Sequence, residues 1–487
     1  MSGKAARYQF RAAESMKSGV AGTPACHAIW GEHGAISRPL ASPPRFGMAA
    51  YMEGEEPPSP IVPDLDGLKG ADHATATPAG GRRKHALTAE WSHETAGNRM
   101  DFLIDGPDRL EALIAAINGA RTSLKLLYYM FSDDVSGNQV MDALIAALGR
   151  GVKVSLIIDG FGSGDTAARF FTRFAEAGGD YHAFSTKWRA TYLIRNHQKL
   201  LIADDALVIT GGFNISDDYF GSIDNIHCWH DLGLRLTGPA VAPMVEYFAA
   251  IEGWVNAPGH NWKSLRFLIH TWDRINPRAA RQRMAYSSES RQSGPLHWYI
   301  GGPTRRFNPW VKAIKADLDA GQRLHMIEAY FAPGQGMLRR IARIATERKG
   351  ATVILPSKSD NGATIGAARI LYGYLLKRGV RIYEFAPTKL HMKLIVIDNI
   401  TWIGTANFDM RSLFINMELM LRIDDPALAE EMRNLVDIHA DHSDVITRLE
   451  HKRQLTPMNR LRWSLAYFIV AVMDYGVTRR LNFGIGG

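Results

Sequence analysis

Cysteine is nearly absent from this chain of 487 residues, which contains only Cys26 and Cys228. Two cysteines cannot build the disulfide framework of a small secreted domain or a cysteine zinc cluster, and their scarcity fits a reducing compartment. The sequence also contains no His-Glu-x-x-His motif and no aspartate-rich metal signature. We therefore expect neither a bound metal nor another cofactor.

Long apolar runs are missing as well. A helix that crosses a bilayer needs about 18 or more consecutive apolar residues, and no such run occurs. The N-terminus also lacks the apolar segment that follows the first basic residues of a signal peptide. These absences predict a cytoplasmic protein, either free or held on the surface of a membrane.

The composition is that of a folded protein with a basic surface. Hydrophobic residues make up 46% of the chain and charged residues 22%, which is typical of globular proteins. The length suggests two or three domains, and the formal net charge is +8. Such a surface attracts nucleic acid or anionic lipid, and charge alone does not choose between them.

The pattern along the chain divides it into five parts. Residues 1–95 are rich in Gly, Ala, Pro and Ser and show no sustained periodicity, so we expect a disordered extension. A polar, arginine-rich linker at 276–294 separates a first half, 96–275, from a second half, 295–450. A basic and apolar tail, 451–487, follows the second half.

Helix and strand patterns alternate in both halves. The predicted elements of the first half are a helix at 107–120, a strand at 123–131, a helix at 138–151 and a strand at 152–159. Asp108 is expected to open the first helix. The same order returns between residues 308 and 385. This repetition predicts an α/β protein with an internal duplication, its sheets covered by helices.

A His-x-Lys-x4-Asp motif occurs once in each half, and an apolar segment, glycine and asparagine follow each copy. A single copy is a weak signal, because polar edge strands often have this composition. Two copies with matched glycine and asparagine, inside duplicated halves, point to function. The predicted catalytic residues are His197, Lys199, Asp204, His391, Lys393 and Asp398.

Each motif predicts a hairpin. Side chains two residues apart in a strand share a face, so each histidine points the same way as its lysine. The turn-forming Asp204 and Asp398 should lie about 20 Å from the histidines, where we expect them to fix the turn. The returning strands then place Asn214 and Asn407 beside the histidines of their own copies.

The residue types suit the binding of a phosphodiester. Glycine allows the backbone to approach a bulky anion, and two facing sets of His, Lys and Asn would stabilise phosphoryl oxygens without a metal. The predicted phosphate-binding residues are Asn214, Asn407, Gly212 and Thr405. Each histidine also needs an orienting partner, and the candidates are Asp231 and Glu418, which open the next strand of each half. We expect His227 and His230 to be surface or packing residues.

These motifs resemble those of the phospholipase D superfamily, and within it the bacterial cardiolipin synthase-like branch. The resemblance covers about residues 100–445 and includes the stretches NHQK, GGFNISDDYFG, WHDLGLRLTGPAV, Tyr330-Phe331-Ala332-Pro333 and GTANFDMRS. It implies a duplicated phospholipase D-like α/β fold, in which two mixed sheets flanked by helices share one active site.

The resemblance also implies a mechanism. His197 would form a phosphohistidine intermediate, and His391 would protonate the leaving alcohol and later activate the acceptor. The family motif includes Asp204 and Asp398 as well. The expected activity is phosphatidyl transfer from phosphatidylglycerol or a similar phospholipid. Hydrolysis to phosphatidic acid is the alternative, and a nuclease is less favoured, because nucleases of the superfamily are usually short chains with one motif that dimerise.

The same resemblance predicts a peripheral protein on the cytoplasmic face of the inner membrane. Its partners would be phospholipid and an anionic membrane surface, not nucleic acid, and it would act as a monomer. Cardiolipin synthases often begin with two membrane helices, which this chain lacks. The apolar stretch Leu465–Met473, flanked by aromatic residues and arginines, is either an interfacial anchor or a helix packed on the domain. Near the motifs, a dry entrance or the core would contain Tyr219, Phe220, Trp402 and Phe408.

Overall fold

The computed structural model describes residues 87–88, 91–184, 194–257, 264–265, 268–269, 294–303 and 308–473. Cys26, the expected extension as far as residue 86, the expected linker as far as residue 293 and the last part of the tail, 474–487, lie outside these described residues. The description below concerns the described residues alone.

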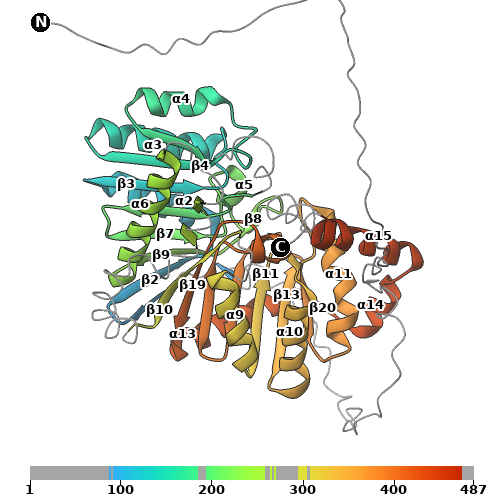
Figure 1. Cartoon of the computed structure of the whole chain (residues 1–487). Helices are drawn as coiled ribbons and strands as arrows, with labels where there is room; N and C mark the ends of the chain where they lie inside the picture. Colours follow the sequence, from blue (N-terminus) through green and yellow to red (C-terminus); the bar gives the residue numbers. More distant parts are fainter. Residues whose placement is uncertain are drawn as a thin grey trace, which may run out of the picture. The chain divides into compact units, whose positions relative to one another are not determined.

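Two eight-stranded sheets form the framework of this part of the chain (Figure 1). The first sheet has the order β1 (Trp91–Thr95), β2 (Asn98–Leu103), β9 (Gly233–Thr237), β7 (Leu207–Gly211), β6 (Lys199–Ala203), β3 (Ser123–Tyr128), β4 (Lys153–Asp159), β5 (Asp180–Phe184). The second has the order β10 (Leu296–Gly301), β19 (Glu418–Asp424), β17 (Ile400–Gly404), β16 (Lys393–Ile397), β11 (Arg323–Glu328), β13 (Gly350–Pro356), β14 (Arg381–Phe385), β20 (Ser443–Ile446).

The two sheets repeat one topology. In each, three neighbouring strands are parallel, β3-β4-β5 and β11-β13-β14, and the other pairings are antiparallel. The order from β2 to β5 matches the order from β10 to β14, strand for strand. The predicted duplication with two mixed sheets is therefore confirmed.

Helices cover the sheets on both sides. The helices of the first half are α2 (Gly106–Gly119), α3 (Val135–Gly149), α4 (Ala168–Glu176), α5 (Asp217–Phe220) and α6 (Ala242–Asn256). Those of the second are α9 (Pro309–Ala320), α10 (Gln335–Glu347), α11 (Gly362–Leu376), α12 (Met410–Phe414), α13 (Pro426–Asp441), α14 (Arg448–Gln454) and α15 (Pro457–Tyr467), and a π-helical turn, η4 (Phe468–Met473), follows α15.

Burial on both faces explains why the central strands are continuously apolar. In β3, Leu126 packs in a core with α2 and α3, whereas Leu127 points to the opposite face. That opposite face belongs to a second core, which contains residues of both sheets together with α6 and α13. A third core lies between the second sheet and helices α9, α10 and α11. The two halves therefore share one hydrophobic layer.

Two expected boundaries need correction. The expected extension was too long at its C-terminal end, because Trp91–Thr95 forms β1 at the edge of the first sheet. Its polar, alternately exposed residues carry little apolar signal. The first helix is capped by Asp105 instead of Asp108, since the Asp105 carboxylate accepts a hydrogen bond from the Gly106 amide at 3.0 Å.

Both motifs form the expected hairpins, β6 with β7 and β16 with β17. At the turns, Asp204 and Asp398 both have φ of 51°, in the left-handed region that aspartate tolerates better than most residues. Four short strands, β8 (Trp229–His230), β15 (Lys389–Leu390), β12 (Phe331–Ala332) and β18 (Phe408–Asp409), pair outside the large sheets. Within the described ranges, every helix is too short or too polar to cross a bilayer.

Candidate active site

The two motif histidines take their carboxylate partners from opposite halves of the chain. His197 Nδ1 lies 3.0 Å from Glu418 Oε1, and His391 Nδ1 lies 2.7 Å from Asp231 Oδ2. All four side chains are buried or nearly so, and both carboxylates are fully buried. Each half therefore supplies one histidine and the acid that orients the other half's histidine.

Backbone hydrogen bonds hold this crossed arrangement. The His197 amide donates to the Met417 carbonyl at 3.0 Å, and the His391 amide donates to the His230 carbonyl at 2.7 Å. β8 pairs with β15 in parallel, and Asn196 forms the equivalent bridge with Met417. The two catalytic segments are thus joined to each other by short β-bridges, and a single site results.

Each lysine supports its own histidine. The Lys199 ammonium donates to the His197 carbonyl at 2.8 Å, and the Lys393 ammonium donates to the His391 carbonyl. Burial lowers the pKa of Lys199 to about 7 and that of Lys393 to about 8, although neighbouring carboxylates oppose the effect. An anion that enters beside the two lysines would therefore stabilise their charged forms.

The pKa values of the two acids beside the histidines, Glu418 and Asp231, are shifted in opposite directions. Burial raises the pKa of Glu418 to about 8, and the nearby Lys199 offsets only part of this rise. Burial also raises the pKa of Asp231, but Lys393 and His391 outweigh it, so the net pKa lies below the ordinary value. At pH 7 His391 thus faces an ionised carboxylate, whereas the ionised form of Glu418, the form that accepts a hydrogen bond from His197 Nδ1, is the minor one in the free enzyme.

Burial keeps both imidazoles neutral at pH 7. It lowers the pKa of His391 to about 3, helped by Lys393 and opposed by Asp231. Burial and the two lysines together lower the pKa of His197 well below its ordinary value. A phosphate anion beside these rings would favour their protonated forms. A carboxylate that accepts a proton from Nδ1 leaves Nε2 of the same ring directed at the reacting group.

Both asparagines that follow the hairpins lie at this site with hydrogen-bonding capacity left. Asn214 and Asn407 are buried, and the side-chain oxygen of each lacks a partner within the described residues. Buried polar atoms without partners are rare in folded proteins. These oxygens can accept from a donor such as a substrate hydroxyl, and the predicted contact to a phosphoryl group, in which the amide NH₂ donates, stays a prediction.

Gly212 and Thr405 have contacts that were not expected, while their phosphate binding stays a prediction. A Cβ atom on Gly212 would lie 2.4 Å from Asp231 Oδ1, so the glycine makes room for that carboxylate. The Thr405 hydroxyl donates to Glu418 Oε2 at 2.6 Å and accepts from the Leu419 amide. Both residues therefore hold the acids that orient the histidines.

The motif aspartates lie at the far ends of the hairpins. Asp204 accepts from the amides of residues 121 to 123 and from the Thr122 hydroxyl. Although burial opposes it, these donors hold the pKa of Asp204 well below its usual range. Asp398 accepts from the Gln322 and Arg323 amides at 2.8 and 2.9 Å. Both fix turns, and neither touches the reacting groups.

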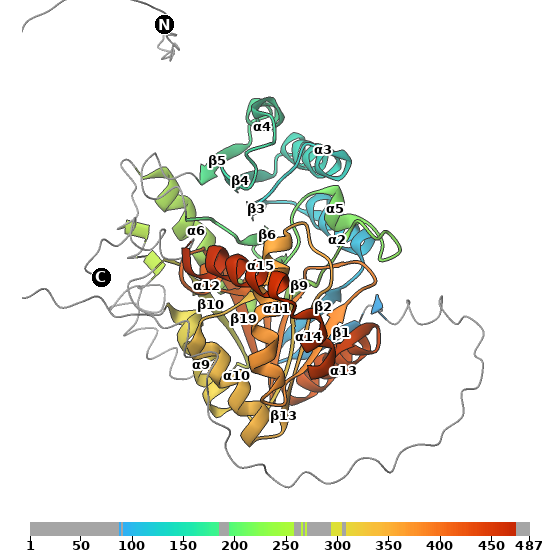
Figure 2. The same ribbon diagram turned by 90° about the vertical axis from the view of Figure 1, so that its right-hand side faces the viewer.

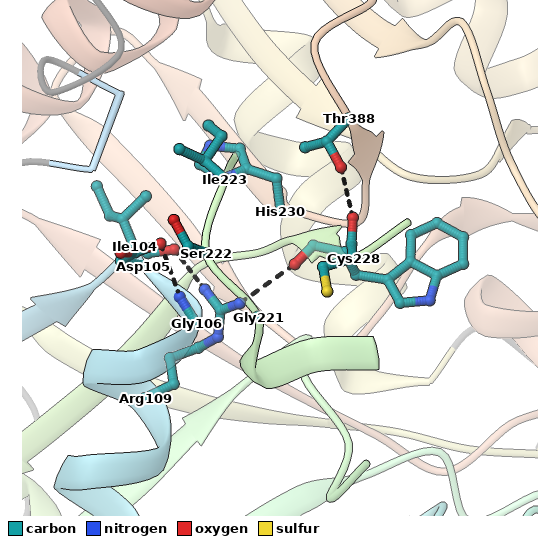
Figure 3. Close-up of a pocket in the computed structure, with 11 residues that line it drawn as sticks. Ile104, Asp105, Gly106, Arg109, Gly221, Ser222, Ile223, Cys228, His230 and Thr388 are labelled. Atoms are coloured by element: carbon teal, nitrogen blue, oxygen red, sulfur yellow. Dashed lines mark hydrogen bonds between the residues drawn. The ribbon is translucent and has the colours of Figure 1, made fainter. Parts of the chain in front are cut away.

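Arg109 is the main residue of the site that the sequence did not reveal (Figure 3). Its fully buried guanidinium donates to four backbone carbonyls, those of Ile104, Tyr219, Trp229 and Asp231. The last three belong to the segment from α5 to the end of β8 and Asp231, which surrounds His391. The Thr388 hydroxyl fixes the same loop from the other half, by donating to the Cys228 carbonyl at 2.6 Å. A single arginine within a helical pattern usually indicates a solvent-exposed face, so no signal marked Arg109.

Aromatic rings enclose the second histidine. The His391 ring centroid lies 5.3 Å from Tyr219, 5.2 Å from Trp229 and 6.2 Å from Tyr330. Tyr129 lies 5.0 Å from His197 in the same way. Of these, only Tyr219 was expected near the entrance.

The other aromatic candidates belong to the core. Trp402 is buried in the second half and donates to Asp317, and Phe408 stacks on Phe331. Phe220 packs against Phe213. For these residues the core-packing alternative therefore holds.

A buried carboxyl group, Glu328, distinguishes the two halves. It lies opposite Lys393 in the β11–β16 pairing, where the first half has Tyr128 opposite Lys199. Neither Glu328 oxygen has a hydrogen-bond partner of good geometry among the described residues. Burial raises its pKa well above the ordinary value, although Lys393 opposes the rise, so burial favours the protonated form of this acid.

The remaining histidines near the site behave as expected. His227 is exposed, whereas His230 is buried, with its Nε2 2.9 Å from His439 Nε2. Across the described ranges, no group of three or more His, Cys, Asp or Glu side chains is arranged to hold a metal ion.

Comparison with known proteins agrees with this geometry. Residues 113–249 and 314–438, more than half of the chain, match the family described as "Cardiolipin synthase, PLD-like domain". The chain is 27% identical over 383 residues to cardiolipin synthase A of Pseudomonas fluorescens, covering 78% of this chain and 76% of that one. It is 30% identical over 351 residues to the cardiolipin synthase of Listeria innocua, covering 70% and 68% of the two chains.

Among solved structures, phosphatidylserine synthase from Haemophilus influenzae has the same fold. Its TM-score is 0.57 at 16% identity, over 82% of this chain and 99% of that one. The duplicated fold and its paired motifs define an enzyme of the phospholipase D superfamily. Within that superfamily, the chain belongs to the cardiolipin synthase-like branch.

Proposed function

We propose that this enzyme is a phosphatidyltransferase that makes cardiolipin from two molecules of phosphatidylglycerol. The observation that carries the proposal is the crossed pair of dyads, His197 with Glu418 and His391 with Asp231, around two buried lysines. Two imidazoles directed at one place suit a double displacement at phosphorus, and the related chains of Pseudomonas fluorescens and Listeria innocua are named cardiolipin synthases.

In the first step, His197 Nε2 attacks phosphorus and the bond from phosphorus to the glycerol oxygen breaks. His391 gives its proton to that oxygen, and glycerol leaves. In the second step, the hydroxyl of another phosphatidylglycerol gives its proton to His391 and attacks phosphorus, and the bond from phosphorus to His197 breaks. After the second step His391 has regained its proton and His197 is no longer bonded to phosphorus, so the cycle closes.

The charges of the site support this order of events. His391 must hold a proton before the first step, and burial alone disfavours that form. The ionised Asp231 and the anionic phosphodiester together stabilise the imidazolium. Lys199 and Lys393, with the side-chain amides of Asn214 and Asn407, stabilise the phosphoryl oxygens.

Hydrolysis is the second candidate, because water can replace the alcohol in the second step. The aromatic rings around His391, from Tyr219, Trp229 and Tyr330, favour transfer. They limit the space open to water next to the base that activates the acceptor. A nuclease is less favoured, since both relatives compared above are named for a lipid-synthesising activity.

The proposed substrate is a bilayer lipid, so we also propose a peripheral location on the cytoplasmic face of the cell membrane. Anionic lipid attracts the basic chain, whose net charge is +8. One chain contains both dyads, and the proposed active form is therefore a monomer.

Lipid mass spectrometry of phosphatidylglycerol vesicles incubated with the purified protein tests the proposal. We expect cardiolipin and glycerol as the main products and phosphatidic acid as a minor one. His391→Ala should abolish both products, whereas His227→Ala, which changes an exposed histidine, should leave them unchanged. Dominant phosphatidic acid that does not fall when phosphatidylglycerol is raised would assign the enzyme to hydrolysis.

A further inference from the structure

Exposed apolar side chains are concentrated on one short segment of the described chain. More than half of the exposed large apolar residues lie between residues 458 and 473, on α15 and the turn η4. They are Met458, Leu461, Leu465, Phe468, Ile469, Val472 and Met473. Such a contiguous patch on a folded domain indicates a surface that meets another apolar phase.

The opposite face of the same segment is packed on the protein. Trp463, Ala466 and Ala471 are buried, and Figure 2 shows α15 lying along α11. A Cβ atom on Gly366 of α11 would lie 3.1 Å from the Ala466 Cβ atom, so the two helices are in close contact. The apolar face is thus presented by a helix that is packed on the domain through its opposite face.

A groove of about 870 Å³ lies between α15 and the start of α11. Lys358 and Arg462 line it, and neither forms an ion pair with a described residue. Ser357 and Ser359 add hydroxyl groups, and its apolar lining comes from Ile365, Trp463, Leu465 and Ile469. Cations and hydroxyls next to apolar walls match the chemistry of a phospholipid, with an anionic headgroup above acyl chains.

This patch is connected to the active site through one short segment. The Tyr467 hydroxyl contacts the Pro333 carbonyl at 3.5 Å, and Ala471 packs on Ala332. Residues 331–332 form β12, which pairs with β18 directly after Asn407. Tyr330, at the start of the same segment, lies against His391. The apolar patch is therefore linked by packing to the segment whose Tyr330 lies against His391.

Two more exposed apolar side chains lie on loops near the site. Phe161 follows Asp159, whose carboxylate accepts from the Asn196 amide at 2.7 Å, one residue before His197. Ile226 lies in the loop that Thr388 ties to the second half. These two side chains thus lie on loops that hydrogen bonds join to Asn196, next to His197, and to Thr388 of the second half.

We propose that the α15 surface, defined as Met458, Leu461, Leu465, Phe468, Ile469, Lys358 and Arg462, docks on an anionic phospholipid bilayer. The two cations contact lipid phosphates while the apolar side chains enter the headgroup region. Docking there brings the entrance beside His391 to the lipid, so a donor enters from the bilayer without crossing water. The inference rests on the proposed phospholipid substrate, and it adds which face of the enzyme receives it.

Vesicle flotation tests the docking, with vesicles of phosphatidylglycerol mixed into phosphatidylcholine and with phosphatidylcholine alone. The apolar variant is Leu461→Glu with Leu465→Glu, and its control is Val445→Glu, an equally exposed position on the edge strand β20. We expect the double variant to bind anionic vesicles at least about tenfold more weakly and the control to bind normally, because binding scales with the apolar area inserted.

The charge variant is Lys358→Glu with Arg462→Glu. Its control is Lys153→Glu with Lys349→Glu, which removes two exposed cations. Lys153 is the first residue of β4 and Lys349 directly precedes β13, whereas Lys358 follows the other end of β13. We expect the first pair to lose about tenfold in binding to anionic vesicles and the second pair to change it far less, since attraction acts only close to the surface. An equal loss in both pairs would mean a general charge effect and would overturn the docking surface.

A soluble, short-chain phosphatidylglycerol separates docking from chemistry. All four variants should turn over this soluble lipid at near wild-type rates. The two docking variants, the Leu461 and Leu465 pair and the Lys358 and Arg462 pair, should turn over lipid in vesicles slowly. If soluble turnover also falls, the milder Leu461→Ser with Leu465→Ser decides, and a fall there too would make α15 a purely structural helix. Wild-type vesicle binding by the docking variants refutes the docking whatever the product, whereas phosphatidic acid as product refutes only the proposed transfer.

Discussion

Glu418, in the second half of the chain, lies 3.0 Å from the ring of His197, 221 residues earlier in the sequence. Its counterpart, Asp231, lies 2.7 Å from His391. A duplicated chain could have paired each histidine with the acid of its own half, and this one does the opposite. The orientation of each imidazole therefore depends on how the two halves pack together.

The two histidines should behave as one unit. We expect His197→Ala and His391→Ala each to reduce turnover by at least about a thousandfold, and the double variant to lose little more. Turnover of phosphatidylglycerol vesicles, measured for all three variants, checks this. A single variant that keeps more than about a tenth of wild-type turnover, a barrier change of only ~1.4 kcal/mol, would contradict the assignment.

Gly212→Ala should disable the enzyme through Asp231. The added Cβ atom would lie 2.4 Å from Asp231 Oδ1, so the carboxylate must move away from His391. We expect turnover to fall about a hundredfold, the scale of a lost acid–base contribution. Gly119→Ala is the matched control, because its added Cβ atom meets nothing within 4 Å. Full activity of the Gly212 variant would show that His391 does not depend on this carboxylate.

Arg109 should act on the histidine that it never touches. Arg109→Met releases the carbonyls of Tyr219, Trp229 and Asp231, so His391 loses its fixed position. With a glycerol leaving group we expect turnover to fall about a hundredfold, because the departing oxygen needs a proton. The first step with a p-nitrophenyl ester should fall far less, since p-nitrophenolate leaves without one.

A burst of p-nitrophenol measures that first step. The control is Arg422→Met, which removes an arginine paired with Asp317 away from the site. If the Arg109 variant slows both substrates equally, Arg109 stabilises the fold without positioning His391. Arg109→Lys serves the same test if the methionine variant does not fold.

The pH profile should fall on the alkaline side because of the lysines. Their pKa values, lowered by burial to about 7 for Lys199 and about 8 for Lys393, place the loss of positive charge in this range. As pH rises through 7 to 8, the free enzyme loses the cations that bind phosphate, so kcat/KM should decrease. Measurement with a soluble phosphodiester, which has no titrating group there, checks it. A flat profile up to pH 9 would count against charged lysines in binding.

Chelation should leave turnover unchanged. The proposed mechanism places Lys199 and Lys393 where other phosphotransfer enzymes use divalent cations. Incubation with excess EDTA followed by an assay on soluble substrate measures this directly. Loss of activity that one divalent ion restores at stoichiometric amounts would require a different mechanism.

The repeated motifs were sufficient to predict the two hairpins, because strand periodicity and turn residues are local properties. They also located Asp204 and Asp398 at the turns, away from the reacting groups. The crossing of the acids was beyond prediction, since which half supplies Asp231 or Glu418 to a given histidine depends on how two sheets pack.

Two residues have contacts that the sequence did not reveal, for a related reason. Gly212 and Thr405 stand beside the motif asparagines, and an approaching anion was expected there. The anion is in each case a carboxylate of the protein, Asp231 or Glu418. Sequence spacing located the close approach correctly and did not reveal what approaches. Arg109 and β1 were not predicted, because neither a single buried arginine nor a polar edge strand produces an apolar pattern in the sequence.

The crossed pairing also has a consequence for biosynthesis. When a ribosome has just added His197, the carboxylate that orients it still lies 221 residues ahead. At roughly 5–20 residues per second, about 10–45 s pass before Glu418 is added to the chain. During that interval the nascent first half has its nucleophile and lacks the group that orients it. In the proposed mechanism, chemistry at phosphorus therefore begins only after nearly the whole polypeptide has been made.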